Sequence, residues 1–147
     1  MSLHKKLEDD LHEAMRSKDE LRKDTIRMIL SSIKLAEIET QKPLDEQGIL
    51  NTIQKEMKIR KETIKELETA NRKDLIDKAL AEIEILDKYL PAQMTDDEII
   101  VLVRGAIAET GATKLAEMGK VMKILLPKVS GAATPDRVSA IVKRLLS

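Results

Sequence analysis

Apolar residues along this chain recur every three or four positions, which is the spacing of one face of an α-helix. A first stretch of this kind covers residues 3–18, and a second begins after Asp19 and ends near Pro43 and Gly48. No segment shows the strict alternation of apolar and polar residues that is typical of a half-buried strand. The pattern therefore predicts an all-α protein.

The middle of the chain continues this pattern in two further helices. Steps of three and four alternate in a seam formed by Leu50, Ile53, Met57, Ile64 and Leu67. This spacing is typical of a helix packed lengthwise against another helix. Asn71 then offers an N-cap, so that either a new helix begins or a long one kinks. Because Pro91 ends the last apolar series, residues 1–90 are predicted to form an N-terminal four-helix unit.

The C-terminal third carries three more helix signals. Thr95 and Glu98 form a capping box, and Gly111 is placed to end the helix that they begin. A second helix is expected before Pro127, with Leu115, Met118, Met122 and Leu125 on its buried stripe. Thr134 followed by proline predicts the start of the last helix. Residues 95–147 are therefore predicted to form a small three-helix unit.

The composition narrows the chemistry that the chain can perform. Cysteine is absent, which excludes disulfides, thiol catalysis and thiolate metal sites. No apolar run approaches the roughly 20 residues of a membrane span, and the first ten residues lack the apolar stretch of a signal peptide. From these absences we expect a soluble cytoplasmic protein without a membrane partner.

Charge is balanced overall but unevenly distributed. Residues 1–94 contain 18 Lys and Arg against 20 Asp and Glu, a net charge of −2. Residues 114–147 contain seven bases and two acids, a net charge of +5. The C-terminal unit is therefore the part of the chain expected to attract anions.

Three other patterns are interpreted as structural. Ser31 and Lys34 match S-x-x-K, but they lie in a predicted helix with no loop that could form an oxyanion hole. His4, Glu8 and His12 share a helix face near the chain terminus, and we interpret that face as solvated. Arg60 interrupts the apolar seam, either because it pairs with a carboxylate or because it faces a ligand. We therefore expect no catalytic residue, no metal and no cofactor.

The basic segment offers the best candidates for ligand binding. Gly119 lies within a helical pattern at a cost of about 1 kcal/mol relative to alanine, which suggests a crowded face approached closely by a helix or a ligand. The loop before residue 134 exposes backbone amides at a helix N-terminus, where anions are favoured. The candidate binding residues are Gly119, Lys120, Lys123, Lys128, Gly131, Arg137, Lys143 and Arg144. A nucleic-acid partner would be recognised by shape and phosphates, because the segment has no aromatic side chain for stacking.

Two strings carry a family resemblance over essentially the whole chain. M-G-K-V-M-K-I-L-L-P-K-V-S-G, followed by a capped helix, resembles the C-terminal signature of the YqeY family. R-K-E-T-I-K-E-L-E-T-A-N-R-K-D-L, with the later E-I-L-D-K-Y-L-P, resembles that family's central block. The family is related to the tail of GatB, a subunit of the glutamine-dependent amidotransferase that acts on mischarged Glu-tRNA or Asp-tRNA.

The resemblance implies a two-part helical protein whose smaller C-terminal part touches the tRNA body. It also implies that the candidate residues contact tRNA, with an aminoacyl-tRNA synthetase or an amidotransferase as a further partner. The GatB tail does not carry the amidation chemistry, and this chain has no amidase constellation and no glycine-rich ATP loop. The favoured function is thus a stand-alone tRNA-binding accessory module linked to aminoacyl-tRNA amidation. The alternative is a helical protein–protein adaptor.

Overall fold

The structure, a computed structural model, describes residues 2–147, and it confirms the all-α prediction. These residues form seven α-helices and one short 3-10 turn, with no strand among them. By their contacts they divide into two compact units, residues 2–90 and Pro91–Ser147. None of the helices within residues 2–147 has the length and the apolar character needed to cross a membrane.

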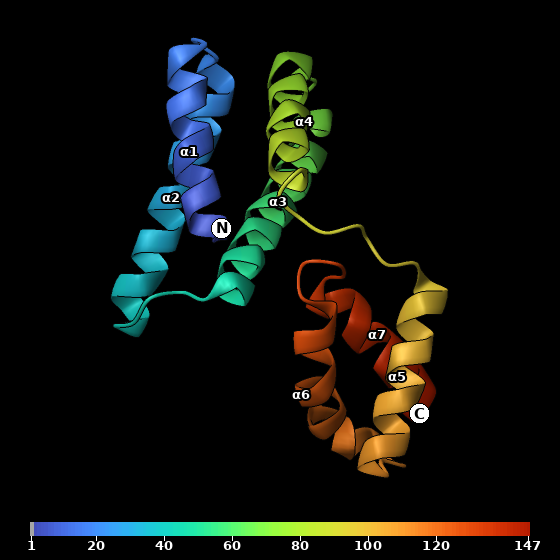
Figure 1. The fold of residues 1–147 in the computed structure, drawn as a ribbon. Coiled ribbons are helices and arrows are strands. Elements are labelled where there is room, and N and C mark those ends of the chain that lie inside the picture. The colour runs from blue at the N-terminus through green and yellow to red at the C-terminus, as the bar shows by residue number, and fades with distance from the viewer. Residues whose placement is uncertain (1) are drawn as a thin grey trace. The chain divides into compact units, whose positions relative to one another are not determined.

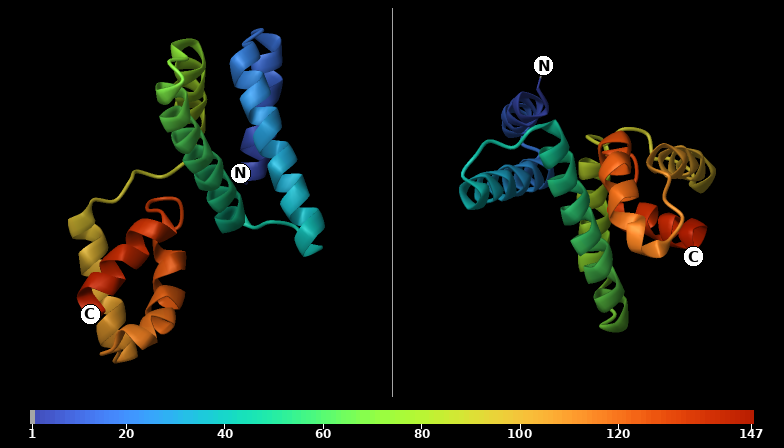
Figure 2. Two further views of the ribbon diagram at one scale, coloured as in Figure 1. Left: turned by 180° about the vertical axis from the view of Figure 1, so that it is seen from behind. Right: turned by 90° about the horizontal axis from the view of Figure 1, so that it is seen from below.

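The first unit consists of two helical hairpins (Figure 1). Its helices are α1 (Leu3–Arg16), α2 (Glu20–Thr40), α3 (Glu46–Thr69) and α4 (Lys73–Asp87). α1 packs chiefly on α2 and α3 chiefly on α4, an arrangement that all three views in Figures 1 and 2 show. The two hairpins meet over an aliphatic core formed by Leu7, Ile26, Ile29, Ile33, Ile49, Ile53, Met57 and Leu86.

Short polar residues begin three of these helices. Ser2, Asp19 and Asp45 each accept a hydrogen bond from the backbone amide three positions later. These amides lie in the first turn, where the helix itself offers them no acceptor. The N-cap predicted at Asn71 is wrong, because Arg72 occupies that position and makes no side-chain cap bond. Asn71 instead adopts φ 56° in the left-handed region, which asparagine tolerates better than most residues. It reverses the chain between α3 and α4.

Arg60 joins the two helices of the second hairpin. Its guanidinium lies 2.9 Å from a carboxylate oxygen of Glu56 in α3 and 3.4 Å from one of Glu82 in α4. Ser32 of α2 donates to the other oxygen of Glu56 at 3.3 Å. The structure therefore confirms Arg60 as a paired arginine in the helix seam.

The second unit contains α5 (Asp96–Thr110), the 3-10 turn η1 (Leu115–Glu117), α6 (Met118–Val129) and α7 (Pro135–Leu146). α5, α6 and α7 each pack against the other two. The capping box at Thr95 and Glu98, the left-handed Gly111 and the cap at Thr134 are all present as predicted. The core contains Ile99, Val103, Ala106, Val121, Leu125, Val129, Val138, Ile141 and Val142.

The predicted break before Pro127 is wrong, because α6 continues through this residue to Val129. Proline has no N–H to donate to the carbonyl of Lys123, one turn earlier. Pro127 is exposed, so solvent can reach this region of the helix. The apolar stripe of α6 also differs from the prediction: Leu115 lies in η1, largely exposed, and Val121 is fully buried.

Candidate nucleic-acid interface

Two of the candidate lysines lie on the face of α6 opposite the core. Val121, Leu125 and Val129 are buried at steps of four. At about 100° per residue, Lys123 and Lys120 lie about 160° and 140° around the helix from Leu125. Both are exposed. They are one turn apart, so their ammonium groups can contact successive phosphates of one backbone.

Lys128 lies in the last turn of α6, because the helix continues past Pro127. It is exposed, on the flank of the buried stripe. Its positive charge interacts favourably with the negative C-terminal end of the helix dipole. This interaction uses no ion pair, so the ammonium group can still bind an anion. The three lysines of α6 thus extend over its length, and the helix contains no acidic residue.

The bases of α7 behave differently from one another. Lys143 and Arg144 are exposed in its last turn. Arg137, two turns before Arg144 on the same outward face, is partly buried. Its Nη2 donates to the carbonyl of Met94 at 3.0 Å and to Oδ1 of Asp96 at 2.7 Å. Arg137 therefore already holds the segment before α5 against the start of α7.

The two candidate glycines have different surroundings. A Cβ added to Gly119 would meet nothing within 4 Å, so the crowded face predicted for it is wrong. The pattern suggested crowding because Met118 and Met122 flank this glycine, yet the stripe is centred on Val121 and Leu125. Gly131 is buried with φ 76°, which favours glycine, and its carbonyl accepts a hydrogen bond from Gln93 at 2.8 Å. Gly131 thus has a structural role, because it allows the left-handed turn in the loop between α6 and α7.

Positive charge predominates in α6 and α7. Residues 118–146 carry six bases and one acid, Asp136, a net charge of +5. Of the seven bases in residues 114–147, Arg137 forms an ion pair with Asp96 of α5. The others remain exposed and hydrated, so that an approaching polyanion would release their counterions.

The structure adds one residue that the sequence patterns did not indicate. Asp96 contacts Arg137 across 41 positions of sequence, and nothing local to either residue signals the pair. The segment just before Asp96 also contacts the loop before α7, because the Met94 amide donates to the Ala132 carbonyl at 2.8 Å. A net-charge count includes Arg137 as an available base, although its charge is already compensated.

The patterns interpreted as structural lie mostly at the surface. Ser31 and Lys34 are exposed, while Ser32 is partly buried. His4 pairs with Glu8 at 2.7 Å. In residues 2–147 no three His, Cys, Asp or Glu side chains converge in a way that could hold a metal ion.

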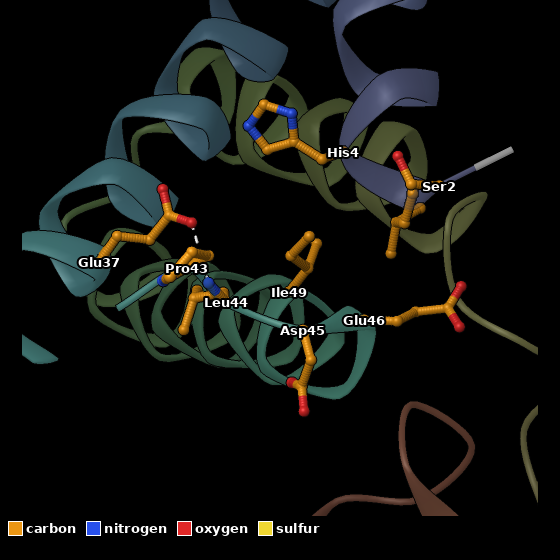
Figure 3. Close-up of a pocket in the computed structure, with 9 residues that line it drawn as sticks. Ser2, His4, Glu37, Pro43, Leu44, Asp45, Glu46 and Ile49 are labelled. Atoms are coloured by element: carbon orange, nitrogen blue, oxygen red, sulfur yellow. Dashed lines mark hydrogen bonds between the residues drawn. The ribbon is translucent and has the colours of Figure 1, made fainter. Parts of the chain in front are cut away.

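A pocket of about 650 Å³ opens in the first unit between the start of α1, the end of α2 and the start of α3. In Figure 3, Glu37 lies on one side of the view beside Pro43 and Leu44, Ser2 and Glu46 lie on the other side, and His4 and Ile49 lie between them. Glu37 accepts a hydrogen bond from the amide of Leu44 at 2.9 Å, so its carboxylate supports the loop. The lining contains three carboxylates and neither lysine nor arginine, which makes it unsuitable for phosphate.

A second polar cluster surrounds Asp10 of α1. Tyr89 donates its hydroxyl proton to Asp10 at 2.5 Å, Lys6 lies 3.3 Å from the same carboxylate oxygen, and Arg22 lies 3.6 Å from the other. Burial, together with the hydrogen bond to Asp10 and its negative charge, raises the pKa of the Tyr89 hydroxyl. Because the donors to Asp10 come from α1, α2 and the turn after α4, this cluster ties the end of the first unit to α1 and α2.

Comparison with known proteins places these features in a family. The family model described as Yqey-like protein matches residues 4–146, nearly the whole chain. A Kluyveromyces lactis protein named "Altered inheritance of mitochondria protein 41, mitochondrial" is 33% identical over 150 residues, covering 95% of this chain and 81% of that protein. The protein of the same name from Lachancea thermotolerans is 46% identical over 85 residues, covering 57% of this chain and 46% of its own length. A third, from Saccharomyces cerevisiae strain YJM789, is 36% identical over 94 residues, with 63% and 51% covered. The matched region thus spans about half the length of the last two relatives.

These relatives correct the expected localisation. They are named as mitochondrial proteins, which points to mitochondria rather than the cytoplasm. The expectation was based on a missing apolar leader. Such a leader marks secretion, whereas mitochondrial transit peptides are amphipathic and rich in arginine, so its absence could not distinguish the two compartments.

Proposed function

Because the chain belongs to the YqeY family, we propose that its C-terminal unit binds tRNA as an accessory module. By the resemblance to the GatB tail, the module would be linked to glutamine-dependent aminoacyl-tRNA amidation without carrying that chemistry. An aminoacyl-tRNA synthetase or an amidotransferase is the further partner that this function would require. The proposal assigns the chain the role of holding tRNA.

One observation carries the proposal: residues 118–146 hold six bases and one acid, and five of these bases are exposed. Lys120 and Lys123 project away from the core, and Lys128, Lys143 and Arg144 are exposed near the ends of their helices. Phosphate contacts of this kind supply most of the affinity of proteins that recognise nucleic acids by shape. The unit has no aromatic side chain, so base stacking would not contribute.

The salt dependence of binding tests the proposal. For B-form DNA, log affinity falls against log salt with a slope of about −0.9 per phosphate contact, and we apply this slope to the duplex arms of tRNA. Five contacts therefore predict a slope of about −4.5, or a loss of roughly 500-fold between 50 and 200 mM salt. We expect this dependence for unfractionated tRNA, measured by fluorescence anisotropy. A slope near zero would contradict the proposal.

A charge reversal locates the contacts. Lys120→Glu with Lys123→Glu should lower tRNA affinity by at least about tenfold and make the salt slope shallower by about two. Both side chains are exposed, so the helical content should match that of the parent. The matched control is Lys61→Glu with Lys65→Glu on α3, which removes the same charge from exposed lysines of the first unit. Equal losses from both pairs would show unspecific attraction.

A protein–protein adaptor is the second candidate, and Val101 is the observation that favours it. This side chain of α5 is 70% exposed, next to Gly105, whose surface is open. A partner docked there would bury apolar area, so its affinity would respond weakly to salt. Retained binding of a protein partner after the Lys120 and Lys123 reversal, together with no tRNA binding by the parent, would support the adaptor.

A further inference from the structure

Arg137 is the exception among the bases of the C-terminal unit. Its Nη2 makes a short ion pair with Asp96, at 2.7 Å, and a hydrogen bond to the carbonyl of Met94. Its Nε and Nη1 make no hydrogen bond within residues 2–147. The guanidinium is therefore compensated on one edge and unpartnered on the other.

Both members of this pair are accessible from solution. The side chain of Arg137 is 39% exposed and that of Asp96 is 71% exposed. An ion pair between such exposed groups contributes little and exchanges readily, because water and salt screen it. Arg137 also lies in the first turn of α7, where the positive end of the helix dipole favours an anion. An RNA phosphate can therefore reach the guanidinium and compete for it.

We propose that Asp96 is an internal competitor that weakens the binding of RNA phosphate at Arg137. The inference rests on the proposed function. A phosphate oxygen and a carboxylate oxygen are both anionic acceptors, and arginine binds either of them bidentately. A phosphate that takes Nη2 must displace Asp96, and a phosphate at the free edge is repelled by the carboxylate that remains. In both cases the negative charge of Asp96 opposes binding.

A matched pair of variants isolates this effect. Asp96→Asn and Asp97→Asn each remove one negative charge from the first turn of α5, so they change the net charge and the helix dipole equally. Asp96 contacts Arg137, and no contact between Asp97 and Arg137 is present among the described residues. We expect Asp96→Asn to bind unfractionated tRNA roughly two- to fivefold more tightly than Asp97→Asn, the range given by an exposed ion pair.

The same two substitutions in a chain that lacks Arg137 show whether the increase in tRNA affinity depends on this arginine. In an Arg137→Gln chain, Asp96→Asn and Asp97→Asn should bind tRNA equally. If Asp96→Asn still binds tRNA more tightly than Asp97→Asn in the Arg137→Gln chain, the inference is overturned. The increase in affinity would then not depend on Arg137. If Asp96→Asn loses helical content by circular dichroism, Asp96→Ser tests the same charge with a residue tolerated at helix starts.

The outcomes separate this inference from the function on which it rests. If the parent binds tRNA but Asp96→Asn binds no more tightly than Asp97→Asn, the inference alone is wrong. If Asp96→Asn binds more weakly than Asp97→Asn, Asp96 orients Arg137 for its ligand and the inference is again wrong. If the parent does not bind tRNA at all, the proposed function and the inference are both overturned.

Discussion

Replacing Arg60 with leucine should destabilise the first unit by about 2 kcal/mol. The substitution leaves Glu56 of α3 and Glu82 of α4 without their shared cation. Their side chains are 19% and 20% exposed, and that of Arg60 is 14% exposed. Breaking a fully buried pair costs about 3–5 kcal/mol, and an exposed pair contributes about 0.2–1 kcal/mol. These partly buried side chains place the expected loss between the two.

Urea unfolding followed by tyrosine fluorescence measures this loss in the intact chain. Tyr89 is the single tyrosine and there is no tryptophan, so the signal reports the first unit only. With a slope of about 1–2 kcal/mol per molar urea, the midpoint should fall by about 1–2 M at unchanged slope. Lys5→Ala is the control, because it removes an exposed ion pair with Asp9 and should leave the midpoint nearly unchanged.

A triple variant completes the test. Replacing Arg60, Glu56 and Glu82 together with leucine removes every charge of the cluster, so no unpaired ion remains. Apolar replacement of a whole ionic cluster is often neutral or stabilising. The triple variant should therefore be more stable than Arg60→Leu alone. The reasoning is refuted if Arg60→Leu unfolds at the same urea concentration as Lys5→Ala, or if the triple variant is the least stable of the three.

Two further predictions concern single positions. Gly119→Ala should stabilise the second unit by about 0.5 kcal/mol, because the added Cβ meets open space in a helix. Gly111→Ala, equally open but at φ 70°, should destabilise that unit by about 1 kcal/mol. Thermal melts by circular dichroism compare them, and a loss for Gly119→Ala would restore the crowded face. Tyr89 should ionise above its ordinary pKa in an ultraviolet absorbance titration, and less far above it in Asp10→Asn. Because its pKa is raised in the folded state, its contribution to stability is complete below about pH 10 and is lost as the pH rises further, since the unfolded chain then loses the proton first. An unshifted titration, or stability that rises with pH in this range, would refute the assignment.

Most of the helices could be predicted because their signals act over a few residues. The capping box at Thr95, the glycine at 111 and the proline after Thr134 each act on neighbouring backbone groups, so their consequences are visible in the sequence. The basic character of residues 114–147 could likewise be counted directly. Asn71 shows the limit of such signals, since the same side chain suits an N-cap and a left-handed turn. In the structure Asn71 adopts the left-handed turn, and Arg72 occupies the N-cap position of α4.

Contacts between helices decided what the local pattern left open. Leu80 follows the apolar period of α4 but is 51% exposed, so it lies outside the buried core of the first unit. Of the candidate bases, Lys120 and Lys123 remain available to a ligand, while Arg137 is paired with Asp96 from another helix. Asp10 and Tyr89, 79 positions apart, meet in the same way. Periodicity shows which face of a helix is apolar. Which side chain meets it depends on how the helices pack, and that is settled by contacts between residues far apart in the chain.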